Sequence, residues 1–212
     1  MGARAEQWRL FVTSENRQQS GMADGAQPGD RKPAPGRLAL VQNFINSVDL
    51  EDGPDEFATI EGLRAFLLRE RLLARAETVS EQDRRHAVEL REALRALALT
   101  NNGFPLPVAA ARTLNSHGNA LPLVAQFQTD GRAALVPVRS GASGAFAAIL
   151  AIVCGAMEEG SWPRFKACRS EVCGWAFFDH SKNRRGRWCS MAVCGSRSKS
   201  RSYAERHRVS EA

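Results

Sequence analysis

Four cysteines near the C-terminus constrain the fold of this chain more than any other feature. They form two pairs, with four residues inside each pair and fifteen residues between the pairs: Cys168, Cys173, Cys189 and Cys194. Two short knuckles joined by a longer loop can bring four soft sulfur ligands to one point, as a structural zinc requires. The spacing therefore predicts a closed four-thiolate metal site.

Two disulfides, or four separate core cysteines, are the alternatives to a metal site. Disulfides require an oxidising compartment, and the first residues of the chain lack the long apolar segment of a secretory signal. Zn²⁺ is the expected ion because a closed thiolate cage leaves no coordination position open, and an iron redox centre is the second choice. The fifth cysteine, Cys154, lies in an apolar run and is expected to be a small buried side chain.

Positive charge is concentrated in the same C-terminal segment. The chain has 212 residues and a formal net charge of +6. From Ser161 on, twelve Lys and Arg residues stand against four Asp and Glu residues, a net charge of +8, which leaves −2 for residues 1–160. A concentrated basic field on a small module predicts a polyanionic partner, most often nucleic acid. The alternative is a solvated basic surface.

Basic residues in two places are candidates for phosphate contacts. One group lies in the loop between the cysteine pairs, and the other follows Cys194 at a spacing compatible with a helix. Guanidinium groups match phosphate oxygens and guanine edges, and such a helix could lie in a major groove or along phosphates. The candidate nucleic-acid-binding residues are Lys182, Arg184, Arg185, Arg187, Arg197, Lys199, Arg201, Arg206 and Arg208.

Aromatic residues between the cysteine pairs alternate with polar ones. Trp175, Phe177 and Trp188 follow this pattern, which predicts a hairpin with one aromatic face. We expect that face to form a miniature core against the metal site rather than a platform for bases.

Composition divides the chain into three parts. Residues 1–36 are polar and rich in Gly, Pro and Asp, as in a disordered leader, and Met22 is a second candidate for the start of translation. Residues 37–160 are expected to form a helical domain, and residues 161–212 the four-cysteine finger with a basic C-terminal helix. Because the finger begins within ten residues of the domain's last helix, we expect it to pack on the domain.

Apolar side chains at helical spacing predict a mainly α fold with a small β-hairpin. A helix is expected over about residues 37–48, and further helices are expected to begin at the N-caps Thr59 and Ser80. Pro107 is expected to start a short helix that a turn at residues 116–119 closes.

A hairpin and an apolar helix complete the expected domain. Asp130-Gly131, a dipeptide favoured at tight turns, predicts the hairpin within residues 121–138. Residues 141–144 are expected to break the chain before an almost wholly apolar helix, 145–157, which runs through the centre of the domain. This stretch is shorter than the roughly 20 residues that a bilayer requires, so we expect no membrane span.

The helical domain carries no enzyme motif. We find no phosphate-cradling glycine motif, no metal-binding histidine pair and no nucleophile elbow, and we expect a protein that is not an enzyme. Binding of a small-molecule effector is an alternative role, because a few polar groups in an apolar wall can form a ligand site. The candidate ligand pocket beside the apolar helix comprises Asn43, Asn46 and Asp49.

The sequence of the finger resembles a known family. It contains Trp175, Phe177 and Asp179 and ends in Cys194-Gly195-Ser196-Arg197, so residues 168–197 resemble the CGNR zinc finger. A serine, Ser196, stands where the motif has asparagine. The resemblance implies a zinc ion held by the four cysteines and DNA binding through the finger.

The region before the finger is similar to the ABATE domain that accompanies it. The similarity rests on residues 43–49, Asn-Phe-Ile-Asn-Ser-Val-Asp, and on residues 149–157. Together the two resemblances cover about residues 37–208. The family is a bacterial set of stress-induced transcription regulators, so the resemblance implies a zinc-stabilised, cytoplasmic regulator that binds DNA.

Three functions are consistent with a basic, metal-braced finger. The first is a regulator that binds duplex DNA. The second is a protein-interaction module that docks an acidic protein, and nuclease treatment of captured partners separates it from the first. The third is an RNA binder, which exposed tryptophans would favour. A homodimer is considered because two-fold pairing is common among oligomers, although no interface stripe is evident.

Overall fold

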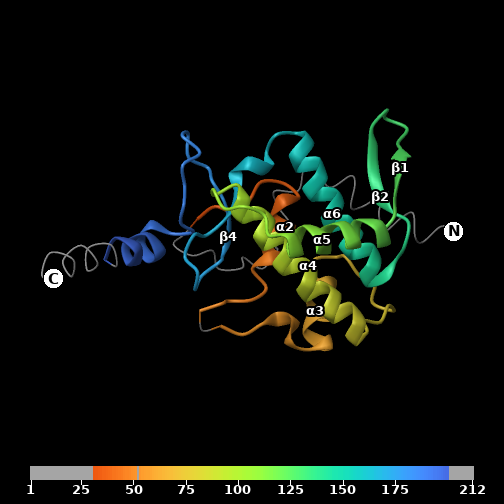
Figure 1. The fold of residues 1–212 in the computed structure, drawn as a ribbon. Helices are drawn as coiled ribbons and strands as arrows, with labels where there is room; N and C mark the ends of the chain where they lie inside the picture. The colour runs from red at the N-terminus through yellow and green to blue at the C-terminus, as the bar shows by residue number, and fades with distance from the viewer. Residues whose placement is uncertain (1–30, 52, 201–212) are drawn as a thin grey trace, which may run out of the picture.

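The protein has a helical body with a hairpin at one end and the cysteine-rich finger at the other (Figure 1). The computed structural model describes residues 31–51 and 53–200. Its α-helices are α2 (Leu38–Ile45), α3 (Ile60–Arg69), α4 (Glu81–Thr100), α5 (Val108–Ala120) and α6 (Gly141–Glu158). Two antiparallel sheets of two strands each pair β1 (Leu123–Phe127) with β2 (Ala133–Pro137) and β3 (Phe165–Ala167) with β4 (Ala176–Phe178). The mainly α fold is confirmed.

Both predicted N-caps form. The Thr59 hydroxyl accepts a hydrogen bond from the backbone N–H of Gly62 at 3.1 Å and starts α3. At the start of α4, the Ser80 hydroxyl accepts from the Asp83 N–H at 3.2 Å, and the Asp83 carboxylate accepts from the Ser80 N–H at 2.9 Å. This reciprocal capping box satisfies two N–H groups that have no partner within the helix.

Three helix boundaries differ from the prediction. α2 ends at Ile45 rather than near residue 48. α5 continues to Ala120, so the predicted turn at residues 116–119 is wrong; α5 packs along α4 and buries His117, which outweighs the weak helix propensity of this polar stretch. α6 begins at Gly141. Residues 141–144 therefore do not break the chain, because packing of this segment in the core compensates for the low propensity of glycine.

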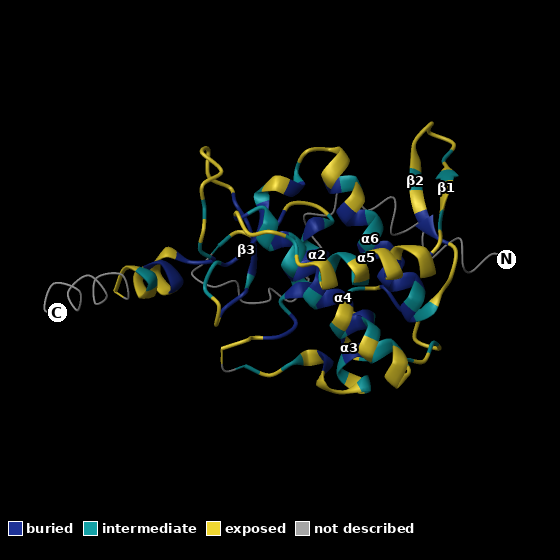
Figure 2. Ribbon diagram, viewed as in Figure 1, coloured by how far each residue is buried: buried dark blue, intermediate teal, exposed yellow. Residues whose placement is uncertain are grey.

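Aromatic and aliphatic side chains from α2, α3, α4 and α6 form the core. Phe44 lies 5.3 Å from Phe57, 5.8 Å from Phe66 and 6.4 Å from Phe146 between ring centroids. All four rings are buried, and the geometries are tilted or edge-on, as aromatic pairs prefer. Figure 2 shows that burial is concentrated where these central helices meet.

α6 is the apolar helix predicted to run through the domain. Among the described residues it is the one helix with the length and composition to cross a membrane, and 56% of its residues are buried inside the protein. It is longer than predicted because residues 141–144 belong to it. Its apolar character follows from its place in the core. Cys154, expected to be buried, is exposed on its outer side.

The hairpin of β1 and β2 confirms the prediction within residues 121–138. Its register pairs Val124 with Val136 and Phe127 with Ala133. Gly131 has a φ of 83° in the connecting loop, a conformation that glycine adopts without strain. The hairpin extends from the body (Figures 1 and 2), and the Phe127 side chain at its tip is 79% exposed.

The finger packs directly against the helical body. α4 contacts β3, and α2 contacts β4. Trp162, Phe165 and Phe178 belong to the same hydrophobic cluster as the core of the helical domain. The predicted hairpin between the cysteine pairs is wrong, because β4 pairs with β3, which precedes the first pair. An aromatic alternation identifies a strand but not its partner.

Candidate metal centre

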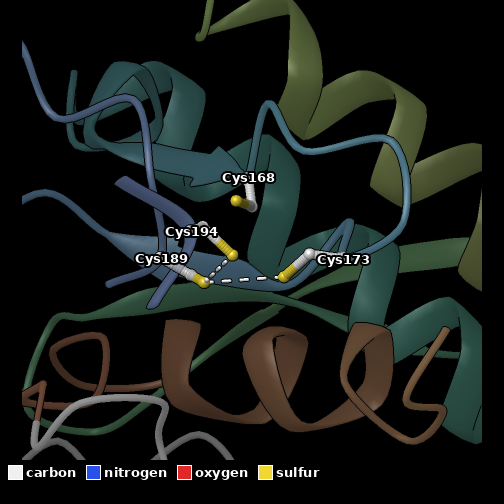
Figure 3. A group of neighbouring side chains, drawn as sticks. All are labelled: Cys168, Cys173, Cys189 and Cys194. Atoms are coloured by element: carbon white, nitrogen blue, oxygen red, sulfur yellow. Dashed lines mark hydrogen bonds between the residues drawn. The ribbon is translucent and has the colours of Figure 1, made fainter. Parts of the chain in front are cut away.

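The four cysteines converge on one point (Figure 3). Their Sγ atoms all lie within 4.8 Å of one another, and all four residues are buried. Cys189 Sγ lies 3.5 Å from Cys173 Sγ and 3.6 Å from Cys194 Sγ. A tetrahedral zinc with Zn–S bonds of about 2.3 Å requires sulfurs about 3.8 Å apart. The spacing and the donor set therefore fit a single closed metal site.

The electrostatics of the cluster also fit a cation. Hydrogen bonds from the thiols of Cys173 and Cys189 lower the pKa of Cys168 to about 2. Interaction with that thiolate raises the pKa of Cys173 to about 12 and raises the pKa of Cys189 further. Four crowded sulfurs therefore share one negative charge by themselves, whereas a divalent cation allows all of them to become thiolates.

Backbone turns present the two cysteine pairs. In the first, Cys173 N–H and Gly174 N–H both donate to the Ser170 carbonyl, at 3.0 and 3.1 Å, and Gly174 takes a φ of 55°. In the second, the Ser190 hydroxyl accepts from the Val193 N–H at 3.3 Å and starts a π-helical turn, Met191–Gly195. The chain remains helical from there to residue 200, which confirms a helix after Cys194 as far as the structure describes it.

Side chains of the helical body hold both cysteine pairs in place. Asn102, just after α4, donates from Nδ2 to the carbonyls of Ala167 at 2.8 Å and Arg187 at 2.9 Å. These residues flank the first and the second pair, so one buried amide joins the two halves of the site. Arg95 Nη1 donates to the Gly174 carbonyl at 2.7 Å.

Asp179 organises the basic loop between the pairs. Its Oδ2 accepts hydrogen bonds from Lys166 Nζ at 2.9 Å and the Gly186 N–H at 2.6 Å, and its Oδ1 accepts from the Ser181 hydroxyl at 2.6 Å. Burial alone would raise the pKa of this carboxyl, but these hydrogen bonds lower it below its usual range. Lys166 also donates to the Arg184 carbonyl at 2.6 Å, so the loop is held at both ends.

The structure places six of the predicted basic residues on the surface of the finger. These exposed residues are Lys182, Arg184, Arg185, Arg187, Arg197 and Lys199. Arg201, Arg206 and Arg208 lie outside the described residues. Arg197 forms an ion pair with Glu51 of the helical domain.

The three residues of the candidate ligand pocket, Asn43, Asn46 and Asp49, each accept or donate hydrogen bonds within the protein. Asn46 donates from Nδ2 to the Ala176 carbonyl at 2.9 Å and accepts from the Ala176 N–H at 2.7 Å. Asn43 donates to Glu70 at 3.3 Å, and Asp49 accepts from the Glu51 N–H at 3.0 Å. Asn46 therefore clamps β4 to the helical domain, and each of the three side chains bonds a different part of the protein.

Residues 31–36, expected to belong to the disordered leader, are attached to the finger and the body. Arg31 donates from Nη2 to the Trp188 carbonyl at 2.9 Å and lies 4.5 Å above the centroid of the Phe177 ring. Ala34 is buried, and its N–H donates to Gln42 Oε1 at 2.6 Å. No periodicity marks such a segment, because isolated contacts rather than a repeated face hold it.

Three residues that support the site were not predicted from the sequence. They are Arg95, Asn102 and Asn46, the last of which acts as a structural clamp. Each lies more than 60 residues from its partner in the finger. Two arginines spaced four apart in an amphipathic helix, Arg91 and Arg95, are normally read as part of a solvated face. The one available signal was that both fall among the apolar positions of α4, beside Leu90 and Leu94.

Comparison with known proteins covers both parts of the chain. Residues 37–158 match the ABATE family, described as "Putative stress-induced transcription regulator". Residues 164–207 match the CGNR zinc finger. A search of curated proteins finds no match. The two matches agree with the resemblance drawn from the cysteine spacing and from residues 43–49.

Proposed function

The chain belongs to the ABATE family and carries a CGNR zinc finger, and from this we propose that it is a zinc-dependent transcription regulator that binds duplex DNA. The observation that carries the proposal is an exposed basic loop held rigidly beside a closed four-thiolate site. Asp179 and Lys166 fix the loop that carries Lys182, Arg184, Arg185 and Arg187. Guanidinium groups held in place lose less conformational entropy when they bind phosphate.

Zinc has a structural role in this proposal. Cys168, Cys173, Cys189 and Cys194 hold the ion and leave no position for a substrate, so the metal supplies folding energy rather than chemistry. The proposal therefore treats the protein as a binding protein and not as an enzyme. Regulation under stress and a cytoplasmic location are expectations that come with the family.

Two surfaces of the finger are proposed to contact DNA together. The loop at residues 182–187 and the helix that carries Arg197 and Lys199 both lie at the finger end of the molecule, and the helix leads away from the body (Figure 1). A helix fits the major groove of B-DNA, while loop arginines can neutralise phosphates beside it. For Arg197 to contact DNA, its ion pair with Glu51 must break.

Partial burial of the tryptophans favours duplex DNA over single-stranded RNA. Trp175 and Trp188 pack against the buried cysteines and are only partly exposed. Base stacking requires an accessible aromatic face. The miniature core predicted for these residues therefore supports a partner that is recognised by charge and groove shape.

The test is a fluorescence-anisotropy titration of the full-length, zinc-loaded chain with duplex DNA at several salt concentrations. The full chain is required because the finger shares its core with the helical domain. If six basic residues contact phosphates, the slope of log affinity against log salt is about −5. No binding to any duplex at low salt overturns the proposal. Tighter binding to single-stranded RNA, or capture of partners that survive nuclease treatment, replaces it with one of the alternatives.

A further inference from the structure

A cavity of about 540 Å³ lies in the helical domain between the first half of α4, the second half of α5 and the start of α6. This volume is in the range of about 300–1,000 Å³ that is typical of small-molecule sites. Its lining comes from residues 82–146 and includes none of the four cysteines. The cavity is therefore separate from the metal centre and from the basic loop.

His117 is a buried polar group that faces this cavity. It is 8% exposed and lies edge-on to His86, with ring centroids 5.6 Å apart. Burial, together with the neighbouring His86, lowers the pKa of His117, so the imidazole is neutral at pH 7. Within the described part of the chain, its ring nitrogens form no hydrogen bond. These nitrogens are not among the fully buried unpaired atoms, and His117 lines the cavity, so they are accessible to a ligand there.

Two arginines supply positive charge at the cavity. Arg112 comes from α5, and Arg139 lies just before α6. Neither guanidinium has an ion-pair partner among residues 31–51 and 53–200. Ser143, in the first turn of α6, also lines the cavity. The first N–H of α6, at Gly141, already donates to the Glu77 carboxylate at 2.8 Å, so the two arginines carry the positive charge that is open to a ligand.

Two acidic residues line the same cavity. The Asp83 carboxylate is already used, because it accepts hydrogen bonds from the Ser80 N–H at 2.9 Å and the Ser80 hydroxyl at 2.6 Å. Glu89 is exposed at the rim. Phe146 and Leu121, whose side chains are apolar and buried, also line the cavity.

We propose that this cavity binds a small organic carboxylate, with the charged group at Arg139 and the apolar part on Phe146 and Leu121. His117 donates a hydrogen bond to the same ligand. Because α6 runs from this cavity through the core, the site is placed to couple a ligand to the rest of the domain. The inference does not depend on DNA binding.

The test uses benzoate as the probe and benzamide, which has the same shape and no charge, as its control. The full-length, zinc-loaded chain contains four histidines, so the ring signals of His86 and His117 can be assigned in ¹H–¹³C spectra. We expect benzoate to shift both signals saturably and to leave the His180 signal in place. We expect no saturable shift with benzamide. Absence of a saturable shift with benzoate, or equal shifts with both probes, overturns the proposal.

Three variants locate the charge. Arg139→Gln is expected to weaken benzoate binding about tenfold, because a charge-assisted hydrogen bond is lost. The matched control, Arg132→Gln on the hairpin, should leave the affinity unchanged. Glu89→Gln should leave it equal or increase it, since a like charge is removed. Unchanged binding in Arg139→Gln, or weaker binding in Glu89→Gln, contradicts a site for carboxylates.

Discussion

Arg95 on α4 donates a hydrogen bond from Nη1 to the carbonyl oxygen of Gly174, at the first cysteine pair, at 2.7 Å. The same guanidinium donates from Nη2 to the Ile45 carbonyl at 2.8 Å and from Nε to Glu92 at 2.9 Å. The residue is only 5% exposed. A single buried side chain therefore ties α2, α4 and the finger together.

Replacing this side chain should destabilise the whole protein. Arg95→Met keeps the apolar stem but leaves two buried carbonyls unpaired, so we expect a loss of about 2–4 kcal/mol in the free energy of unfolding. Urea denaturation of the zinc-loaded chain measures it. The control is Arg85→Met, an exposed position on the same helix, which should change stability by less than about 0.5 kcal/mol. Equal effects of the two substitutions would show that the contact to Gly174 contributes nothing.

Loss of the metal should unfold the finger and loosen the body. Cys189→Ala removes one ligand of a site whose binding free energy is typically about 10–16 kcal/mol. Elemental analysis should find one zinc per natural chain and little or none in the variant. Because Phe165 and Phe178 belong to the common core, thermal unfolding of the helices should shift as well. Cys154→Ser, at the exposed fifth cysteine, should keep the metal; loss of zinc there would contradict a four-cysteine site.

Arginines of the basic loop should contribute to DNA affinity through charge. Arg184→Gln and Arg185→Gln are each expected to weaken duplex binding similarly for all sequences and to reduce the salt slope by about 1. Anisotropy titrations at three salt concentrations measure both quantities. Arg85→Gln on α4 serves as the matched control. A salt slope that stays the same in both variants would show that this loop does not contact DNA.

Glu51 should compete with DNA for Arg197. The two side chains form an exposed ion pair, and exposed pairs are weak. Glu51→Gln frees the guanidinium and removes a negative charge from the surface near the finger, so DNA affinity should rise by up to about fivefold. The same titration in Arg197→Gln tests the mechanism, because there Glu51→Gln should have a smaller effect, limited to the removal of the negative charge. A fall in affinity on Glu51→Gln would contradict the competition.

Glu70 should make stability depend on pH. Burial raises the pKa of this carboxyl, although Asn43 donates a hydrogen bond to it. A raised pKa means that the folded state binds the proton more tightly, so deprotonation costs stability as pH rises above the unfolded value of about 4.3. Glu70→Gln should therefore be more stable than the natural chain at pH 7, with a smaller advantage at about pH 4.3, the unfolded value. Urea denaturation of both proteins at the two pH values checks this. A stability advantage of Glu70→Gln that shrinks with rising pH would contradict it.

Local signals in the sequence predicted local structure well. Ser80 and Asp83 are three residues apart and cap α4 as expected, and Asp130-Gly131 lies in the loop of the hairpin. These features depend on contacts between residues that are neighbours along the chain, so the sequence alone is enough to predict them. The turn expected at residues 116–119 failed because burial of His117 against α4 outweighs local propensity.

The sequence by itself determined the metal centre. Four cysteines at this spacing can bind one ion together, and that pattern is recognised without knowing which distant residues contact it. Tertiary structure alone decided which residues support it. Arg95, Asn102 and Asn46 contact finger residues that are 65 or more positions away in the chain. A polar residue on a helix gives no sequence signal for a buried hydrogen-bond partner at that distance. The strand pairing of β3 with β4 was decided in the same way, because the pairing of an alternating segment depends on what the folded body places beside it.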